Sequence, residues 1–86
     1  MPEISRFFGM VITMYFNDHD PPHFHVRHGA KKGRFGINEI RMIEGDLGSR
    51  ARNLILDWAR LHQEELRQEW ENARNQRPLF PIEPLE

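Results

Sequence analysis

Two histidines, His23 and His25, stand two residues apart in a short segment that is otherwise apolar. In an extended strand, residues at this spacing share one face, and the two faces alternate along the chain. Phe24 and Val26 occupy the other face and favour the core of the protein. We therefore expect both imidazoles on the outward face of a strand.

A metal site is one interpretation of this pair, because two imidazoles on one strand face can bind a single ion. Asp18, His19 or Asp20 could supply a further ligand from the preceding loop. The predicted ligand set is His23, His25 and Asp20, with zinc or another divalent metal as the cofactor. Against this interpretation, the sequence contains no second spaced pair of ligands, so the leading expectation is a protein without a cofactor.

Acid–base chemistry on RNA is a second interpretation, since imidazoles can move protons near neutral pH and guanidinium groups can hold a phosphate. The same alternation places Tyr15, Arg27 and Arg34 beside the two histidines. The predicted catalytic residues are His23, His25, Tyr15 and Arg27. The alternative is that these polar residues form an ordinary solvated face, so the sequence leaves enzymatic activity open.

A candidate phosphate site lies at the start of the expected helix, where Arg50 and Arg52 stand in the first turn. The helix dipole disfavours cations there, whereas the free backbone amides and two guanidinium groups favour a bound phosphate or RNA. Alternatively, Asp46 and Asp57 neutralise the arginines in local pairs. Three further cations are expected to contribute if they share that side: Lys31, Lys32 and Arg34.

The elements that position these residues follow from hydrophobic periodicity. Stretches rich in β-branched and aromatic residues or with period-two alternation, separated by turn residues, predict three or four antiparallel strands within residues 9–44. The expected strands are Met10–Phe16, His23–His28, Gly33–Asn38 and a short edge strand, Arg41–Glu44.

From Ser49 the period changes, and apolar residues recur at three- and four-residue steps as far as Ala73. This pattern predicts one amphipathic helix over residues 49–75, capped by Ser49 and ended before Pro78. At about 1.5 Å per residue such a helix is roughly 39 Å long. We expect it to overhang the sheet.

Residues 78–86 combine three prolines with four large apolar residues and predict an extended Pro-rich tail. The tail and the overhanging end of the helix would leave apolar surface uncovered in a monomer. The predicted protein contact is therefore formed by Trp70, Phe80 and Ile82.

The composition places the chain among small globular proteins. It has 86 residues, 12 basic and 13 acidic residues, and no cysteine. Such a length predicts a single α+β domain over residues 1–86, with an antiparallel sheet on one long C-terminal helix. The absence of cysteine and of a signal peptide or membrane span favours the cytoplasm. A small core favours a partner or a homo-oligomer.

Segments from both ends and the middle of the chain carry a resemblance. Pro2 to Gly9, the run Pro21-Pro22-His23-Phe24-His25-Val26, the stretch from Trp58 to Trp70, and Ile82 to Leu85 together resemble a small bacterial family called domain of unknown function 4160. The paired prolines followed by His-Phe-His are the most specific part. The resemblance implies a stand-alone protein encoded beside a second short protein, an arrangement similar to toxin–antitoxin modules.

The function expected from these observations is that of a toxin–antitoxin-like component that binds a small cognate protein and, in addition, RNA. Two alternatives stay open. One is an enzyme or metal-binding domain that uses His23 and His25, and the other is a purely structural interaction domain. The resemblance implies no reaction, so the functional role expected of the two histidines is inferred from their chemistry alone.

Overall fold

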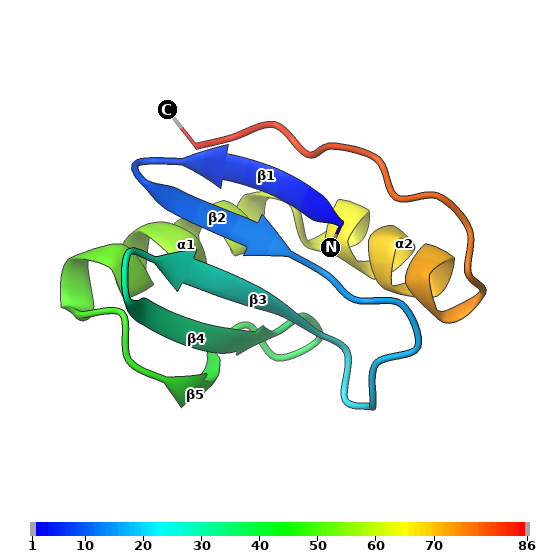
Figure 1. The fold of residues 1–86 in the computed structure, drawn as a ribbon, viewed down its shortest axis with the longest axis horizontal. Coiled ribbons are helices and arrows are strands. Elements are labelled where there is room, and N and C mark those ends of the chain that lie inside the picture. Colours follow the sequence, from blue (N-terminus) through cyan, green and yellow to red (C-terminus); the bar gives the residue numbers. More distant parts are fainter. Residues whose placement is uncertain (1, 86) are drawn as a thin grey trace.

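The sheet of the computed structural model, which describes residues 2–85, is a five-stranded antiparallel meander with its strands in chain order (Figure 1). Met1 and Glu86, the ends of the predicted domain and tail, lie outside the described residues. The strands are β1 (Glu3–Phe7), β2 (Met10–Thr13), β3 (His23–His28), β4 (Lys31–Gly36) and β5 (Met42–Gly45).

The first strand, β1, was not predicted, and it makes the sheet larger than the expected three or four strands. It pairs with β2 through a tight turn at Phe8 and Gly9, whose φ angles are 49° and 76°. Glycine adopts positive φ readily because it has no Cβ atom. The turn therefore joins the predicted strand, β2, to a preceding strand, β1, that the hydrophobic pattern did not indicate.

Other strand bounds differ in detail from the prediction. β3 has the predicted bounds, whereas β2 ends at Thr13 rather than Phe16, because Thr13 opposite His25 is the last pair between these strands. β4 begins at Lys31, inside the expected loop, because Gly29 and Ala30 suffice for the turn. The expected edge strand is β5.

Two helices, α1 (Ser49–Leu61) and α2 (Gln63–Arg74), lie on one face of the sheet (Figure 1). The prediction of one unbroken helix is wrong, because the backbone of His62 leaves the helical conformation with φ of −117° and ψ of 24°. Its amide is shared between the carbonyls of Trp58 and Ala59. Neither helix is both long and apolar enough to cross a membrane, within residues 2–85.

The core between sheet and helices is aromatic at its centre. Phe24 and Phe35 stack across β3 and β4 with ring centroids 5.5 Å apart, and Trp58 of α1 meets Phe24 edge-on at 5.7 Å. All three side chains are fully buried. Their strand positions follow the predicted inward parity, so β3 is fixed in register above the helices.

The C-terminal segment, residues 77–85, contains no helix or strand and runs beside β1 (Figure 1). The Ile82 amide donates to the Ile4 carbonyl at 2.7 Å, and the Ile82 carbonyl accepts from Ser5 Oγ at 2.9 Å. Trp58 Nε1 donates to the Glu83 carbonyl at 2.8 Å. These bonds attach the segment to both the sheet and α1.

The expected helix overhang is absent. The longest dimension of the protein is 33 Å, and Trp70 of α2 packs on His23 of β3. Trp70 and Ile82 are each 3% exposed, and Phe80 is partly buried. The apolar surface that motivated a protein contact at these three residues is therefore covered by the chain itself.

Candidate metal centre

The loop between β2 and β3 brings one carboxylate against two imidazoles. Asp18 Oδ2 lies 3.0 Å from His23 Nε2 and 3.1 Å from His25 Nε2. The three ligand atoms lie within 4.8 Å of one another. Ligand atoms around a tetrahedral zinc ion are about 3 to 3.5 Å apart. The cluster therefore approaches the spacing of a metal site.

The second ring nitrogen of His23 determines what the first can do. His23 Nδ1 lies 2.7 Å from the Pro21 carbonyl oxygen, which can only accept, so Nδ1 carries a proton. In the neutral form of the ring, Nε2 carries the lone pair that a metal ion would need. That atom is buried without a hydrogen-bond partner, because its contact with Asp18 has the distance but not the direction of a hydrogen bond. Metal-binding histidines are commonly oriented by a backbone carbonyl in this way.

Asp18 is held in its ionised form. Burial by itself would raise the pKa of Asp18, but the hydrogen bond with His25, the His19 amide and the charges of both histidines outweigh burial and leave the pKa below its usual value. The His19 amide donates to Oδ1 at 2.9 Å, which leaves Oδ2 to the imidazoles. An ionised carboxylate is the form that binds metal.

The expectation that His23 faces outward is wrong, although its position on β3 was predicted. His23 is only 2% exposed. The ring of Trp70 from α2 lies against it at a centroid distance of 5.3 Å, and the Asp18 carboxylate covers its Nε2. His25 is half-buried, with its ring 5.1 Å from that of His23. The pair thus joins a buried imidazole to a partly accessible one.

Asp20, the predicted third ligand, is exposed, and the cluster within residues 2–85 contains Asp18 in its place. The reason is the chain reversal at Pro21 and Pro22. Asp18 stands three residues before this proline pair and His25 three residues after it, so the reversal sets them opposite each other. This symmetry in the sequence is the signal that would have selected Asp18.

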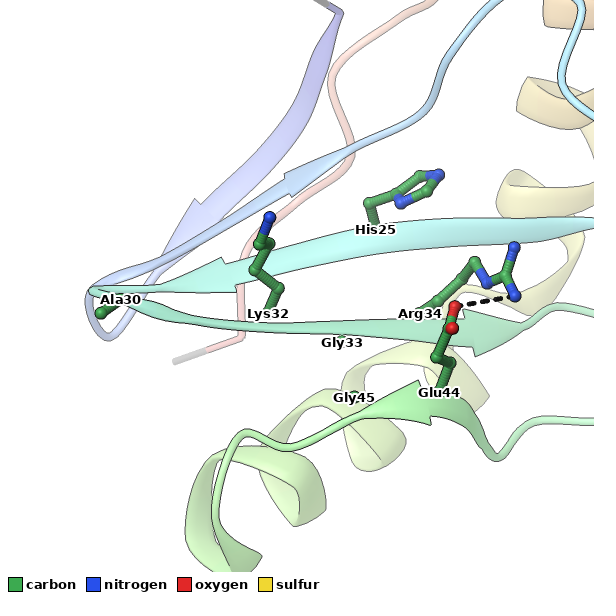
Figure 2. A pocket seen from close by; sticks show the side chains of 7 residues that line it. All are labelled: His25, Ala30, Lys32, Gly33, Arg34, Glu44 and Gly45. Carbon is green, nitrogen blue, oxygen red and sulfur yellow. Dashed lines mark ion pairs between the residues drawn. The ribbon is translucent and has the colours of Figure 1, made fainter.

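The open face of the sheet, which is the face turned away from the helices, carries a row of polar residues across four strands. Thr13 pairs with His25, His25 with Arg34, and Arg34 with Glu44. Figure 2 shows His25 and Lys32 projecting to the same side, while Arg34 and Glu44 meet in an ion pair of 2.9 Å. These side chains border a hollow of about 480 Å³.

A second hollow, of about 250 Å³, adjoins the first and shares His25 and Lys32 with it. It is also lined by Tyr15, whose ring lies edge-on to His25 at 4.5 Å, and by Arg27. Three of the four predicted catalytic residues therefore border one hollow. The fourth, His23, is buried next to His25.

The start of α1 forms a separate region. A hollow of about 580 Å³ there is lined by Arg50 together with apolar residues that include Phe8. Lys31 lies beside Gly48 at this helix start. Lys32 and Arg34, which were grouped with Arg50 and Arg52 in the sequence, border the open-face hollow instead. Successive residues of β4 point to opposite faces, and this alternation divides the predicted cation cluster.

The helix start also differs from the prediction in its N-cap residue and in its ion pairs. Gly48 rather than Ser49 is the N-cap, and Asp46 Oδ1 accepts from the Gly48 amide at 2.9 Å. Asp57 pairs with Arg60 at 3.3 Å. Among residues 2–85, Arg50 and Arg52 have no ion pair.

Comparison with known proteins assigns the family. The family model described as domain of unknown function (DUF4160) matches residues 9–71. The chain belongs to this family. The matched region contains the whole Asp18, His23 and His25 cluster, both open-face hollows and most of the two helices. No curated protein and no solved structure gives a significant match.

Proposed function

We propose that this DUF4160 protein binds a divalent transition-metal ion through Asp18, His23 and His25. The observation that carries the proposal is the buried Nε2 atom of His23. It has no hydrogen-bond partner, yet it lies 3.0 Å from a carboxylate oxygen while the other nitrogen of its ring is fixed by the Pro21 carbonyl. A metal ion would satisfy this lone pair and hold all three groups together.

The donor set favours zinc or iron(II) over magnesium or calcium. Imidazole nitrogens suit transition metals, whereas magnesium and calcium prefer sites made of oxygen ligands alone. Three protein ligands leave a coordination position for water or substrate, as in catalytic zinc sites. The ion would act there as a Lewis acid or lower the pKa of a bound water.

The direct test is calorimetric titration of zinc into the purified chain, with cobalt(II) absorption as a second readout of coordination. Wild type is expected to bind one ion per chain. Asp18→Asn and His25→Gln should each weaken binding by more than the roughly 10- to 100-fold typical of outer-shell partners. Asp20→Asn is the matched control, because Asp20 is an exposed carboxylate of the same loop. Equal losses in the Asp20 and Asp18 variants would disprove the assignment.

A second candidate function, binding of a small cognate protein as in a toxin–antitoxin-like module, is favoured by the hollow beside Phe8. This hollow of about 580 Å³ is mainly apolar, and Phe8 itself is 56% exposed. The predicted contact at Trp70, Phe80 and Ile82 would instead require the Pro-rich C-terminal segment to leave its place beside β1.

Native mass measurement of the chain co-expressed with a short protein encoded beside it tests this second candidate and also reports homo-oligomers. Phe8→Ser should abolish the complex, whereas Leu61→Ser, which alters an exposed apolar residue on α1, should not. A complex that survives Phe8→Ser would place the contact elsewhere. Loss of the complex only after removal of residues 78–86 would favour the tail contact.

A further inference from the structure

The open face of the sheet carries cations that the fold leaves without partners. Arg27 and Lys32 are exposed and pair across β3 and β4. Within residues 2–85 neither has an ion pair. Glu3 accepts two hydrogen bonds from Arg6, which lower its pKa more than the charge of Arg27 does. The centre of this face is therefore positively charged, although the chain as a whole has a net charge of −1.

Arg34 adds a third cation to the same region, where its side chain lines the larger hollow and is 38% exposed. Its Nη2 pairs with Glu44 Oε1 at 2.9 Å, but its Nε is buried and has no hydrogen-bond partner. Because Nε is closed to solvent, a ligand in the hollow can meet only the other N–H groups of the guanidinium. A guanidinium with one edge engaged by a carboxylate can still donate to a second acceptor, and phosphate oxygens are the acceptors that arginine recognises best.

The shape of the face extends the recognition beyond one group. The two hollows, of about 480 and 250 Å³, share His25, Ala30, Lys32 and Gly33, so they adjoin each other at Lys32. Arg34 borders one side, and Arg27 and Tyr15 border the other. Cations spaced along two adjoining hollows suit a chain of phosphates better than a single anion.

We infer that this open face binds the backbone of single-stranded nucleic acid, with successive phosphates held by Arg34, Lys32 and Arg27. Arg27 and Lys32 would each neutralise one phosphate, and Arg34 would hold the strand beside His25. The strand would then pass next to the Asp18, His23 and His25 cluster. In this last respect the inference rests on the proposed metal site, whereas the binding itself does not.

The test uses a fluorescently labelled ten-residue oligouridylate and the matching oligothymidylate, titrated with the full chain at several salt concentrations in EDTA. Arg27→Gln with Lys32→Gln should weaken binding about tenfold or more at low salt. It should also reduce the slope of log K against log salt by about 1.4, since each phosphate contact on a single strand contributes about 0.7. Inorganic phosphate and uridine monophosphate should compete only weakly.

Two charge-matched double variants serve as controls. Arg60→Gln with Arg77→Gln removes the same charge from exposed positions outside the open face and should leave affinity within about twofold. Arg50→Gln with Arg52→Gln tests the helix start. Loss of binding in that variant, with full binding in the Arg27 and Lys32 variant, would overturn the inference. If uridine monophosphate competed as strongly as the oligomer, the claim that the face binds a chain of phosphates would be wrong. If no oligonucleotide bound, the open face would not be a nucleic-acid site.

Zinc titration separates this inference from the proposed metal site. The Arg27 and Lys32 double variant should bind zinc as wild type does, because neither residue is one of the three proposed ligands. Asp18→Asn should lose zinc but keep oligonucleotide binding in EDTA. If wild type binds no zinc and the oligonucleotide still binds through Arg27 and Lys32, only the metal proposal fails. Equal affinity for the two oligomers would assign recognition to the phosphates, whereas preference for oligouridylate would indicate contacts to the 2′-hydroxyl groups.

Discussion

Two buried polar side chains of this protein, His23 and Glu69, make an instructive comparison. His23 is 2% exposed and Glu69 is completely buried. Each has one side-chain atom bound to the backbone: His23 Nδ1 to the Pro21 carbonyl, and Glu69 Oε1 to the Phe80 amide at 2.9 Å. Each also has one atom without a hydrogen-bond partner, His23 Nε2 and Glu69 Oε2.

Their surroundings give these similar atoms different roles. The lone pair of His23 faces two further metal-ligating groups, Asp18 and His25. Burial raises the pKa of Glu69 to about 7, although the Phe80 amide opposes the rise and nearby Glu65 adds to it. We therefore expect the first site to be satisfied by a cation and the second by a proton. The type of neighbour, rather than burial, distinguishes a ligand site from a protonation site.

The largest effect that tests this difference is stabilisation by metal. A ligand that binds only the native state at a free concentration of 1,000 times its Kd adds about 4 kcal/mol to the free energy of unfolding. Wild type should gain this amount with zinc in urea denaturation, whereas His23→Gln should gain almost none. His23→Gln also removes packing against Trp70, so its gain is measured relative to its own metal-free stability.

Glu69→Gln is the matched control, since it alters the other buried site and keeps every proposed ligand. Its gain from zinc should equal that of wild type. If zinc stabilised His23→Gln as much as wild type, the ion would bind elsewhere and the contrast between the two sites would fail.

The second effect is the pH dependence of stability that Glu69 confers. Its folded-state pKa of about 7 lies above the ordinary glutamate value of 4.5, so the native state binds the proton more tightly. This contribution is fully present below pH 4.5 and is lost as pH rises through about 7. The loss is on the order of 2 to 3 kcal/mol. Urea unfolding of metal-free wild type between pH 5 and 8 measures it.

Glu69→Gln keeps an acceptor for the Phe80 amide but cannot ionise, so its stability should fall less over this range. The difference between the two proteins isolates the contribution of Glu69 from that of all other groups. The contribution of Asp18 to stability changes with pH in the opposite direction, because its pKa is lowered. Its contribution is lost only as pH falls toward and below 3.8, outside this range. Parallel pH profiles for wild type and Glu69→Gln would show that Glu69 is already ionised in the native state.

The parts of the fold that the sequence predicts are those set by local periodicity. β3 has the predicted bounds because its alternation is uninterrupted between the prolines and Gly29. α1 and α2 follow from three- and four-residue steps. The bend at His62 was not predictable from that pattern, since the apolar period continues through it. Gln63, the first residue of α2, donates from Nε2 to the Ile37 carbonyl at 2.9 Å, and the apolar pattern gives no sign of this contact.

The candidate site was predictable to the same extent. The strand period assigned His25 and Arg27 to the open face, and the structure has them there. His23 is buried in part by Trp70, a residue far from it in the sequence. Asp18 depends on how the loop folds back, which composition alone does not determine. The local sequence pattern thus predicts the strand that carries the site, whereas tertiary contacts determine which residues form the site.

The smallest expected effect concerns the two tryptophans. Trp70 connects the two compared sites, because it follows Glu69 in the sequence and its ring packs on His23. Trp58 Nε1 donates to the Glu83 carbonyl, whereas Trp70 Nε1 is buried without a partner. Trp58→Phe and Trp70→Phe remove similar ring volume, but only the first breaks a hydrogen bond. Trp58→Phe should therefore cost about 1 kcal/mol more in urea unfolding. Equal costs would mean that the Trp70 donor is satisfied in solution, and a lower zinc affinity in Trp70→Phe alone would show that its ring helps to orient His23.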